Sequence, residues 1–332
     1  MNEYRHQPLL DQWVLIAPNR AKHYTVMTAV SGAPNLENPF LPGNEGKTPQ
    51  EIYRVADGKG GWKVRVFPNR FPLLSLESPN RPFLRDGVER KGGFGAHEMV
   101  IDSAQPDLRL CDFDADRLQN LFTAFRDRIA ALHRDQRIQS VIAVKNQGFA
   151  SGNTIPHSHS QVVGLGFIPP MLALQMRTSR DHYQRTGRSL LGDLLEQESQ
   201  SPRLLGENRY FAAFFPAASR YPFETWIVPK EQHHDFSTSE EEMLHALGHL
   251  GRVVLDKLGR ALDKPDLTLQ LFTAPPVREH PDPAYYHHMD RFFRWHLQLI
   301  PRFTPCDGVE LATGIAINPV APETAADYLT KL

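Results

Sequence analysis

The 332-residue chain has little of three things that usually indicate a protein's class. Its two cysteines, Cys111 and Cys306, are too few for a disulfide framework and fit a reducing compartment. Its 37 basic and 38 acidic residues nearly cancel, which gives no indication of binding to nucleic acid or an anionic membrane. It has no apolar run of about 18 residues, and its first residues are too polar for a signal peptide. We therefore expect a soluble cytoplasmic protein, in which an anionic small molecule would need only a local cluster of polar groups.

The spacing of apolar residues predicts two copies of one α+β unit. Residues 114–134 carry apolar side chains at intervals of three and four, which predicts an amphipathic helix between strands. The same order recurs after a polar connection, with a second helix predicted at 239–261. Two short matches, HSHSQVVGL with RWHLQLIPR and HEMVIDS with FETWIVP, occur in the same order and favour a duplication. We predict an α+β fold whose units, residues 1–175 and 176–332, are each an antiparallel sheet with helices packed on one face.

The segment HSHSQ is the densest group of chemically active side chains. Alternate residues of a strand face the same side, so His157, His159 and Gln161 would share one face. The preceding loop is rich in Gly, Ser and Asn, and includes Gly152 and Thr154. Its backbone amides and hydroxyl groups would suit a phosphate.

Three kinds of chemistry fit the two histidines. A metal site would need one or two ligands from elsewhere in the chain. Either imidazole could serve as a general acid or base near neutral pH. One imidazole could instead attack a phosphorus centre, with the other histidine and Gln161 orienting the reacting groups. A hydrogen-bonded strand without any chemistry is the remaining interpretation.

In its wider context, HSHSQ resembles the active-site motif of the galactose-1-phosphate uridylyltransferase family, a branch of the histidine-triad superfamily. The resemblance covers almost the whole chain and implies two histidine-triad-like units. HSHSQ and INPVAPE look closer to the ADP-glucose phosphorylase type than to the uridylyltransferases, whose motif is HPHGQ. The similar segments are WVLIAPNRAKHY, NPFLPGNEGKTP, FPNRFP, KNQGFASGNTIPHSHSQ, FETWIVPKEQHHDF, WHLQLIPR and GVELATGIAINPVAPETAA.

The resemblance implies a nucleotidyltransferase of galactose or other carbohydrate metabolism that works in two steps. His159 would attack the α-phosphorus of a nucleoside diphosphate hexose, UDP-glucose or ADP-glucose, and expel hexose 1-phosphate. An acceptor, hexose 1-phosphate or phosphate, would then remove the nucleotide from the histidine. Gln161 would hydrogen-bond the transferred phosphoryl group, and His157 would orient the loop. The other residues implied as substrate contacts are Arg20, Asn69, Phe71, Asn146, Gly152, Thr154, Ser160 and Glu310.

The chain departs from the family at the positions that often hold a structural zinc. The CxxC positions are Asn38 and Leu41, the third ligand position is Pro106, and only His157 remains. A single imidazole holds zinc weakly, so we predict no metal and no other cofactor, with Leu41 and its neighbours packed where the metal would be. In the second half, His296 is interpreted as a remnant of the duplicated motif.

The resemblance also implies a homodimer that acts on nucleotide-sugar and sugar-phosphate or phosphate substrates. Two alternatives stay open: a dinucleoside polyphosphate phosphorylase or hydrolase of the same superfamily, and a catalytically silent nucleotide-binding sensor. The presence of both His159 and Gln161 favours catalysis. No residue distinguishes a uridine from an adenosine donor.

Overall fold

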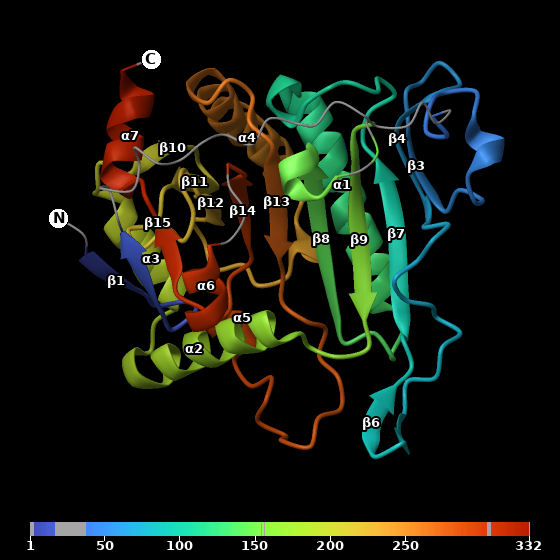
Figure 1. Ribbon diagram of the computed structural model, residues 1–332, viewed down its shortest axis with the longest axis horizontal. Helices are drawn as coiled ribbons and strands as arrows, with labels where there is room; N and C mark the ends of the chain where they lie inside the picture. The colour runs from blue at the N-terminus through green and yellow to red at the C-terminus, as the bar shows by residue number, and fades with distance from the viewer. Residues whose placement is uncertain (1–2, 17–37, 154, 156, 304–306, 332) are drawn as a thin grey trace.

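One ten-stranded antiparallel sheet forms the centre of the molecule (Figure 1). The computed structural model describes residues 3–16, 38–153, 155, 157–303 and 307–331. The strands of the sheet are β3 (Tyr53–Ala56), β4 (Trp62–Pro68), β7 (Gly95–Ile101), β8 (Ser140–Gln147), β9 (His159–Leu165), β10 (Leu204–Glu207), β11 (Phe211–Phe214), β12 (Thr225–Pro229), β13 (Leu267–Phe272) and β14 (His296–Pro301). They lie in the order β10-β11-β12-β14-β13-β8-β9-β7-β4-β3.

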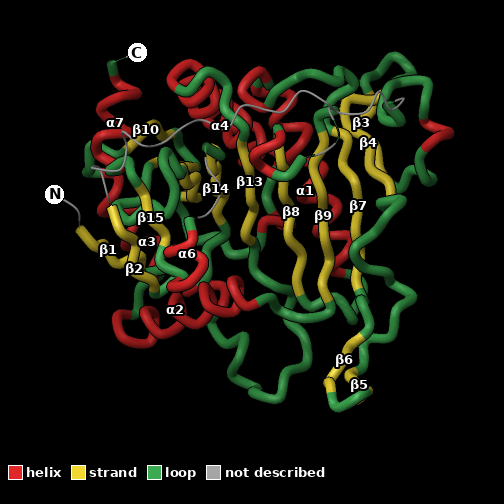
Figure 2. Tube along the Cα trace, viewed as in Figure 1, coloured by secondary structure: helices red, strands yellow, loops and turns green. Residues whose placement is uncertain are grey.

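Two smaller sheets and seven α-helices complete the described part of the chain (Figure 2). The smaller strands are β1 (Glu3–Gln7), β2 (Gln12–Ile16), β5 (Pro82–Arg85), β6 (Val88–Lys91) and β15 (Ala316–Asn318). The helices are α1 (Ala115–His133), α2 (Pro170–Thr186), α3 (Leu190–Ser199), α4 (Glu241–Ala261), α5 (Met289–Phe292), α6 (Gly308–Thr313) and α7 (Pro322–Thr330). None of the helices within the described ranges combines the length and apolarity needed to cross a bilayer.

The strand order repeats itself from the middle of the sheet outward. β8 and β13 each follow a long helix, α1 and α4, and they pair with each other. Beyond them lie β9, β7, β4 and β3 on one side, and β14, β12, β11 and β10 on the other (Figure 1). The predicted α+β class is confirmed, and the structure adds that the sheets of the two halves join into one. The predicted boundary after residue 175 falls inside α2 and stays a prediction.

The two long helices pack together over one face of this sheet. Asp114 caps α1 by accepting a hydrogen bond from the Arg117 amide, and the predicted apolar stripe of α1 is buried. α4 lies close against α1 at Gly248, where a Cβ atom would be only 2.6 Å from the carbonyl oxygen of Ala115. The helices and the sheet share one continuous apolar core. Because these helices cover one face, a substrate site near the middle of the sheet must lie on the opposite face.

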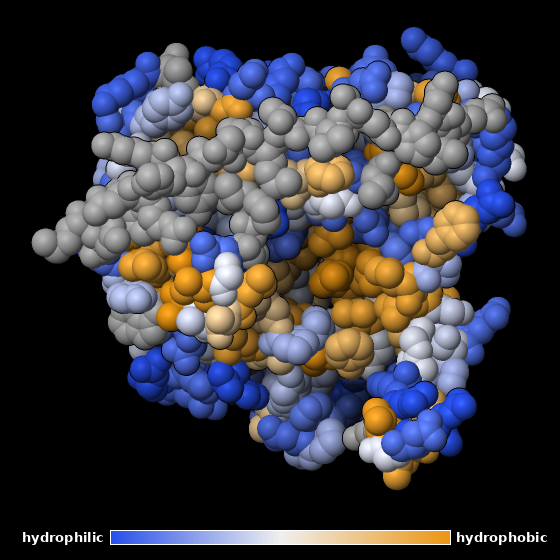
Figure 3. All heavy atoms as spheres, in the orientation of Figure 1, coloured by the Kyte–Doolittle hydropathy of each residue, from blue (hydrophilic) through white to orange (hydrophobic). Residues whose placement is uncertain are grey.

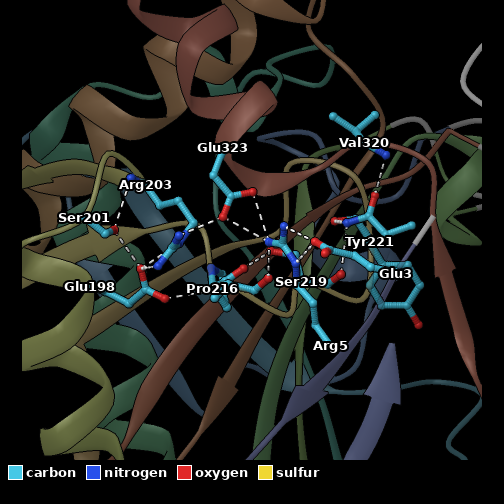
Figure 4. Close-up of polar contacts among 12 residues, drawn as sticks. Glu3, Arg5, Glu198, Ser201, Arg203, Pro216, Ser219, Tyr221, Val320 and Glu323 are labelled. Atoms are coloured by element: carbon cyan, nitrogen blue, oxygen red, sulfur yellow. Dashed lines mark hydrogen bonds and ion pairs between the residues drawn. The ribbon is translucent and has the colours of Figure 1, made fainter. Parts of the chain in front are cut away.

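The two ends of the chain are joined to the second half through a group of charged side chains (Figure 4). Arg5 of β1 donates to both carboxylate oxygens of Glu323 of α7 at 3.0 Å. Arg203 donates to Glu323 at 2.7 Å and also pairs with the buried Glu198 of α3. β15 runs parallel to β2, which adds backbone hydrogen bonds between the same regions.

A buried ion pair links three central strands behind the HSHSQ motif. The Lys145 ammonium on β8 lies 2.8 Å from the Asp102 carboxylate just after β7, and both side chains are excluded from water. Asp102 accepts hydrogen bonds from the Ser158 and Ser160 hydroxyl groups at 2.6 Å each, and Lys145 donates to the carbonyl oxygen of His159. Burial alone would raise the pKa of Asp102, but Lys145 and these donors hold it below its ordinary value. The pair therefore stays ionised and fixes the beginning of β9.

We expect Lys145→Met to lower the free energy of unfolding by about 3–5 kcal/mol, because it leaves the Asp102 charge buried without its partner. Urea denaturation followed by circular dichroism measures the change. Lys63→Met, at an exposed position on β4, is the matched control and should stay within about 0.5 kcal/mol of the wild type. Equal effects of the two substitutions would contradict a structural role for the buried pair.

Candidate active site

The HSHSQ motif lies at the start of β9 on the sheet face opposite α1 and α4. Gln161 is paired with Met99 on β7 and with Val144 on β8, in the middle of the first half. Ser160 points to the other face, toward Asp102, as strand alternation predicts. Seen from the side opposite α1, the surface is hollowed in the middle, with many hydrophobic residues beside the hollow (Figure 3).

His159 is held in the form that a nucleophile requires. Its Nδ1 lies 2.7 Å from the carbonyl oxygen of His157, and because a carbonyl only accepts, Nδ1 carries the proton. Nε2 then holds a lone pair, and no side chain in the described ranges bonds it. Burial lowers the pKa of His159, so the imidazole is neutral at pH 7. The Phe40 ring packs against it in an edge-to-face arrangement, with the ring centroids 5.8 Å apart.

His157 uses both ring nitrogens for hydrogen bonds within the protein. Nε2 donates to the carbonyl oxygen of Ser103 at 2.8 Å, and Nδ1 accepts from the Asn38 amide at 2.9 Å. The orientation of the Asn38 amide is set because its oxygen accepts from the Phe40 backbone N–H. His157 thus connects the motif to two other segments. Its pKa is lowered by burial.

This arrangement does not fit a structural zinc at these positions. The amide of Asn38 occupies the lone pair that His157 would need for a metal, and Pro106 contributes its carbonyl oxygen to the Ser158 N–H. Besides Ser103, His157 contacts Asn38 and Phe40, which are close neighbours of Leu41 in the segment expected to pack where the metal would be. Within the described ranges, no group of three or more His, Cys, Asp or Glu side chains could hold a metal ion.

The loop before the motif differs from the expected phosphate-binding loop. Asp266, from the second half, accepts a hydrogen bond from the Ala150 N–H at 2.8 Å. The amides of residues 151–153 bond to carbonyl oxygens inside the loop, and the Ser151 hydroxyl donates to the carbonyl oxygen of Gly148. Gly152 takes a positive φ of 85° that ends this turn. The backbone amides of residues 150–153 therefore already have partners within the protein, and phosphate binding by this loop stays a prediction.

Asn146 and Asn69 lie beside the motif. The register of β8 with β9 places Asn146 on the His159 side, half-buried, and its side-chain amide has no partner among the described residues. Asn69 follows β4, and its backbone N–H donates to the carbonyl oxygen of His97 on β7. The Asn69 side chain accepts from the Phe71 N–H, and the Phe71 ring is 81% exposed.

The other residues predicted to contact the substrate do not lie beside His159 and Gln161 in the described structure. The Ser160 hydroxyl is committed to Asp102 on the far face. The carboxylate of Glu310 closes the capping box of α6 with Asp307 and also accepts from the Ile317 N–H. Two further predicted residues, Arg20 and Thr154, lie outside the described residues.

The second copy of the motif is closed off by aromatic rings. His296 begins β14 as His159 begins β9, and its Nδ1 likewise faces the carbonyl oxygen two residues earlier, at 3.5 Å. Its ring stacks on Phe272 with centroids 5.1 Å apart and lies 5.4 Å from Trp226. Complete burial lowers the pKa of His296 to about 4. The second histidine is thus an interior residue.

The comparisons with known proteins agree with this geometry. Residues 1–169 match the family model for the N-terminal domain of galactose-1-phosphate uridyl transferase. An ADP-glucose phosphorylase of Arabidopsis thaliana is 30% identical over 336 residues, which cover 99% of this chain and 93% of the relative. A galactose-1-phosphate uridylyltransferase of Thermotoga maritima is 24% identical over 338 residues, covering 100% of this chain and 98% of the relative. A crystal structure of an A. thaliana ADP-glucose phosphorylase with bound ADP-glucose has a TM-score of 0.86 at 29% identity, covering 100% of this chain and 99% of the other.

The fold and the site together define a nucleotidyltransferase of the histidine-triad superfamily. Within that class, the chain belongs to the galactose-1-phosphate uridylyltransferase family. The resemblance in the sequence is thereby confirmed, and so is the expectation of an enzyme of carbohydrate metabolism.

His97 is a residue of this site that the sequence analysis missed. Its Nε2 lies 2.7 Å from the Oε1 atom of Gln161, although 64 positions separate the two in the chain. A lone histidine in a strand gives no functional signal of its own, because histidines are found both inside proteins and at their surfaces. Only the pairing of β7 with β9 reveals its neighbour.

We expect an alanine substitution to destabilise the protein more at Gly148 than at Gly152. A Cβ atom at Gly148 would lie 1.7 Å from the Asp266 carboxylate, and φ there is +83°. Gly148→Ala should lower the free energy of unfolding by about 2–3 kcal/mol. Gly152 has a similar φ, but the methyl group of an alanine there would enter open space. Gly152→Ala should therefore lower the free energy of unfolding by only about 1 kcal/mol in the same urea titration. A larger loss at Gly152 would contradict the contact between Asp266 and the loop.

Proposed function

We propose that the protein is an ADP-glucose phosphorylase that forms a covalent adenylyl intermediate on His159. The observation that carries this proposal is the geometry of His159, a neutral imidazole whose Nδ1–H is held by a carbonyl oxygen and whose Nε2 has no partner among the described residues. The choice of ADP-glucose is supported by the likeness, over the whole chain, to a protein solved with that molecule bound.

Two displacements at the α-phosphorus make up the reaction. In the first, Nε2 of His159 forms a bond to phosphorus, and the bond to the oxygen bridging the two phosphates breaks, so glucose 1-phosphate leaves with that oxygen. In the second, an oxygen of inorganic phosphate attacks the same phosphorus, the P–N bond breaks, and ADP forms. A neutral imidazole needs no base to remove a proton before attack.

The amide groups around His159 support the transfer of a charged phosphoryl group. Gln161 accepts from His97 through Oε1, which leaves its NH₂ group as a donor. The half-buried amide of Asn146 lies on the same side of β8. Donors held in place before the reaction stabilise the negative charge that gathers on the phosphoryl oxygens. An Nε2 without a partner in the described part of the chain, beside such donors, favours catalysis over a silent nucleotide sensor.

We also propose a cytoplasmic homodimer. Burial raises the pKa of the Cys111 thiol to about 11, which makes it unreactive and suits a reducing compartment.

The homodimer is supported by exposed apolar side chains on the segment between β4 and β7, which a second chain would cover. These side chains are Phe71, Leu73, Leu76, Phe83, Leu84 and Val88.

We expect the wild-type protein to gain the mass of one AMP unit when it is incubated with ADP-glucose without phosphate. Intact-mass spectrometry after a quench that avoids acid detects this adduct. His159→Asn should form none, because the nucleophilic imidazole is gone. His245→Asn, on the exposed face of α4, is the matched control and should label like the wild type.

Addition of phosphate should remove the adduct and release ADP. Labelling by UDP-glucose in place of ADP-glucose would assign a uridylyltransferase. Labelling by a dinucleoside polyphosphate would assign a dinucleoside polyphosphate phosphorylase or hydrolase. No adduct with any of these donors would contradict the covalent mechanism.

We further propose that the HSHSQ region binds no zinc, because both nitrogens of His157 already have partners. Metal analysis of the purified protein should find far less than one zinc per chain. The double substitution Asn38→Cys and Leu41→Cys restores the CxxC pair and should raise the zinc content, which provides a positive control. Stoichiometric zinc that is lost on His157→Asn would overturn this proposal.

A further inference from the structure

We propose that His97 is a positioning residue that turns the Gln161 amide so that its NH₂ group faces the transferred phosphoryl group. This inference rests on the proposed function, because Gln161 has its role only if phosphoryl transfer occurs at His159. The side chains of His97, Gln161 and His159 come from β7 and β9, adjacent strands of the sheet, and lie on its open face.

The hydrogen bonds of His97 leave one arrangement of its protons. Nδ1 lies 3.0 Å from the backbone N–H of Leu73, which can only donate, so Nδ1 must be the acceptor. The ring proton is then on Nε2, which lies 2.7 Å from the side-chain oxygen of Gln161. The Asn69 NH₂ group lies 3.4 Å from Nδ1 and 3.3 Å from Nε2, and because it can only donate, its partner is the unprotonated Nδ1. His97 is therefore the neutral Nε2–H form and donates to Gln161.

This donor decides which end of the Gln161 amide is presented to the substrate. The two ends of an amide have nearly the same shape but opposite hydrogen-bonding character. With Oε1 bound to His97, the NH₂ group takes the other direction and can donate to a phosphoryl oxygen. Without His97, the amide could turn its oxygen to the phosphoryl group, which would repel it. His97 never needs to touch the substrate to exert this effect.

The same histidine also holds the segment that follows β4. Its carbonyl oxygen accepts from the Asn69 N–H at 2.8 Å, while its Nδ1 accepts from Leu73. The exposed ring of Phe71, a predicted nucleoside contact, lies between these two attachment points. His97 thus connects the segment 69–73 with the phosphoryl side of the site. At 6% exposed, it is buried between them.

The rate of adenylyl transfer to His159 tests this inference. His97→Phe keeps a planar ring but removes its hydrogen bonds to Leu73, Asn69 and Gln161. Single-turnover labelling by ADP-glucose should then slow by about ten- to hundredfold, which reaches at most the lower end of the loss caused by a missing oxyanion donor. His97→Gln can place an amide N–H near the position of Nε2, and it should recover part of the rate. Urea titration of each variant separates a slow site from a poorly folded protein.

A double-substitution cycle distinguishes positioning from a general structural role. If His97 acts through Gln161, His97→Phe should have little further effect on the rate in a Gln161→Ala background. Full additivity of the two losses, or a His97→Phe variant that labels at the wild-type rate, would overturn the inference while leaving the proposed function intact.

The proton position can be measured without any reaction. In ¹⁵N spectra of the wild type, His97 should show a protonated Nε2 and an unprotonated Nδ1, and its Nε2 signal should shift in Gln161→Ala. If no donor labels the protein, the proposed function fails, and these spectra still decide the inference: a proton on Nδ1 would overturn it, and the expected pattern would support the positioning of Gln161.

Discussion

The ion pair between Lys145 and Asp102 is the constraint on which the site depends. Two charges without access to water must satisfy each other and take further hydrogen bonds, or the fold loses several kcal/mol. Asp102 takes them from the two serines of HSHSQ, and Lys145 also donates to the carbonyl oxygen of His159. The motif therefore has a side that belongs to the core. Its other side, with His159 and Gln161, is left to the open face of the sheet.

The two halves show how one backbone arrangement can serve different purposes. His159 and His296 both begin a strand with Nδ1 near the carbonyl oxygen two residues earlier. What differs is the surroundings: Phe272 and Trp226 enclose the ring of His296, while Nε2 of His159 has no partner among the described residues. Reactivity in this fold is thus set by the neighbours of the histidine rather than by the strand that carries it.

Much of the fold could be predicted because its local patterns are regular. The stripe of apolar residues in α1 and the alternation around HSHSQ have the periods of a helix and a strand, and both predictions agree with the structure. The interactions that were missed join distant residues, such as His97 with Gln161 and Asp266 with the loop at Ala150. They depend on which strands pair, and a single sequence carries no such information. The loop's composition predicts phosphate binding, and composition alone could not indicate that the amides of residues 150–153 have partners within the protein.

The joining of both halves into one sheet limits how the molecule can move. β8 and β13 pair from Ala143 to Gln147 and from Leu267 to Leu271, and the apolar core continues across this seam. Halves joined in this way cannot swing apart on a hinge, as independent domains do, without breaking a backbone ladder in the middle of the core. The sheet therefore remains a rigid floor beneath His159, and access to the site is set by the side chains and loops on its open face.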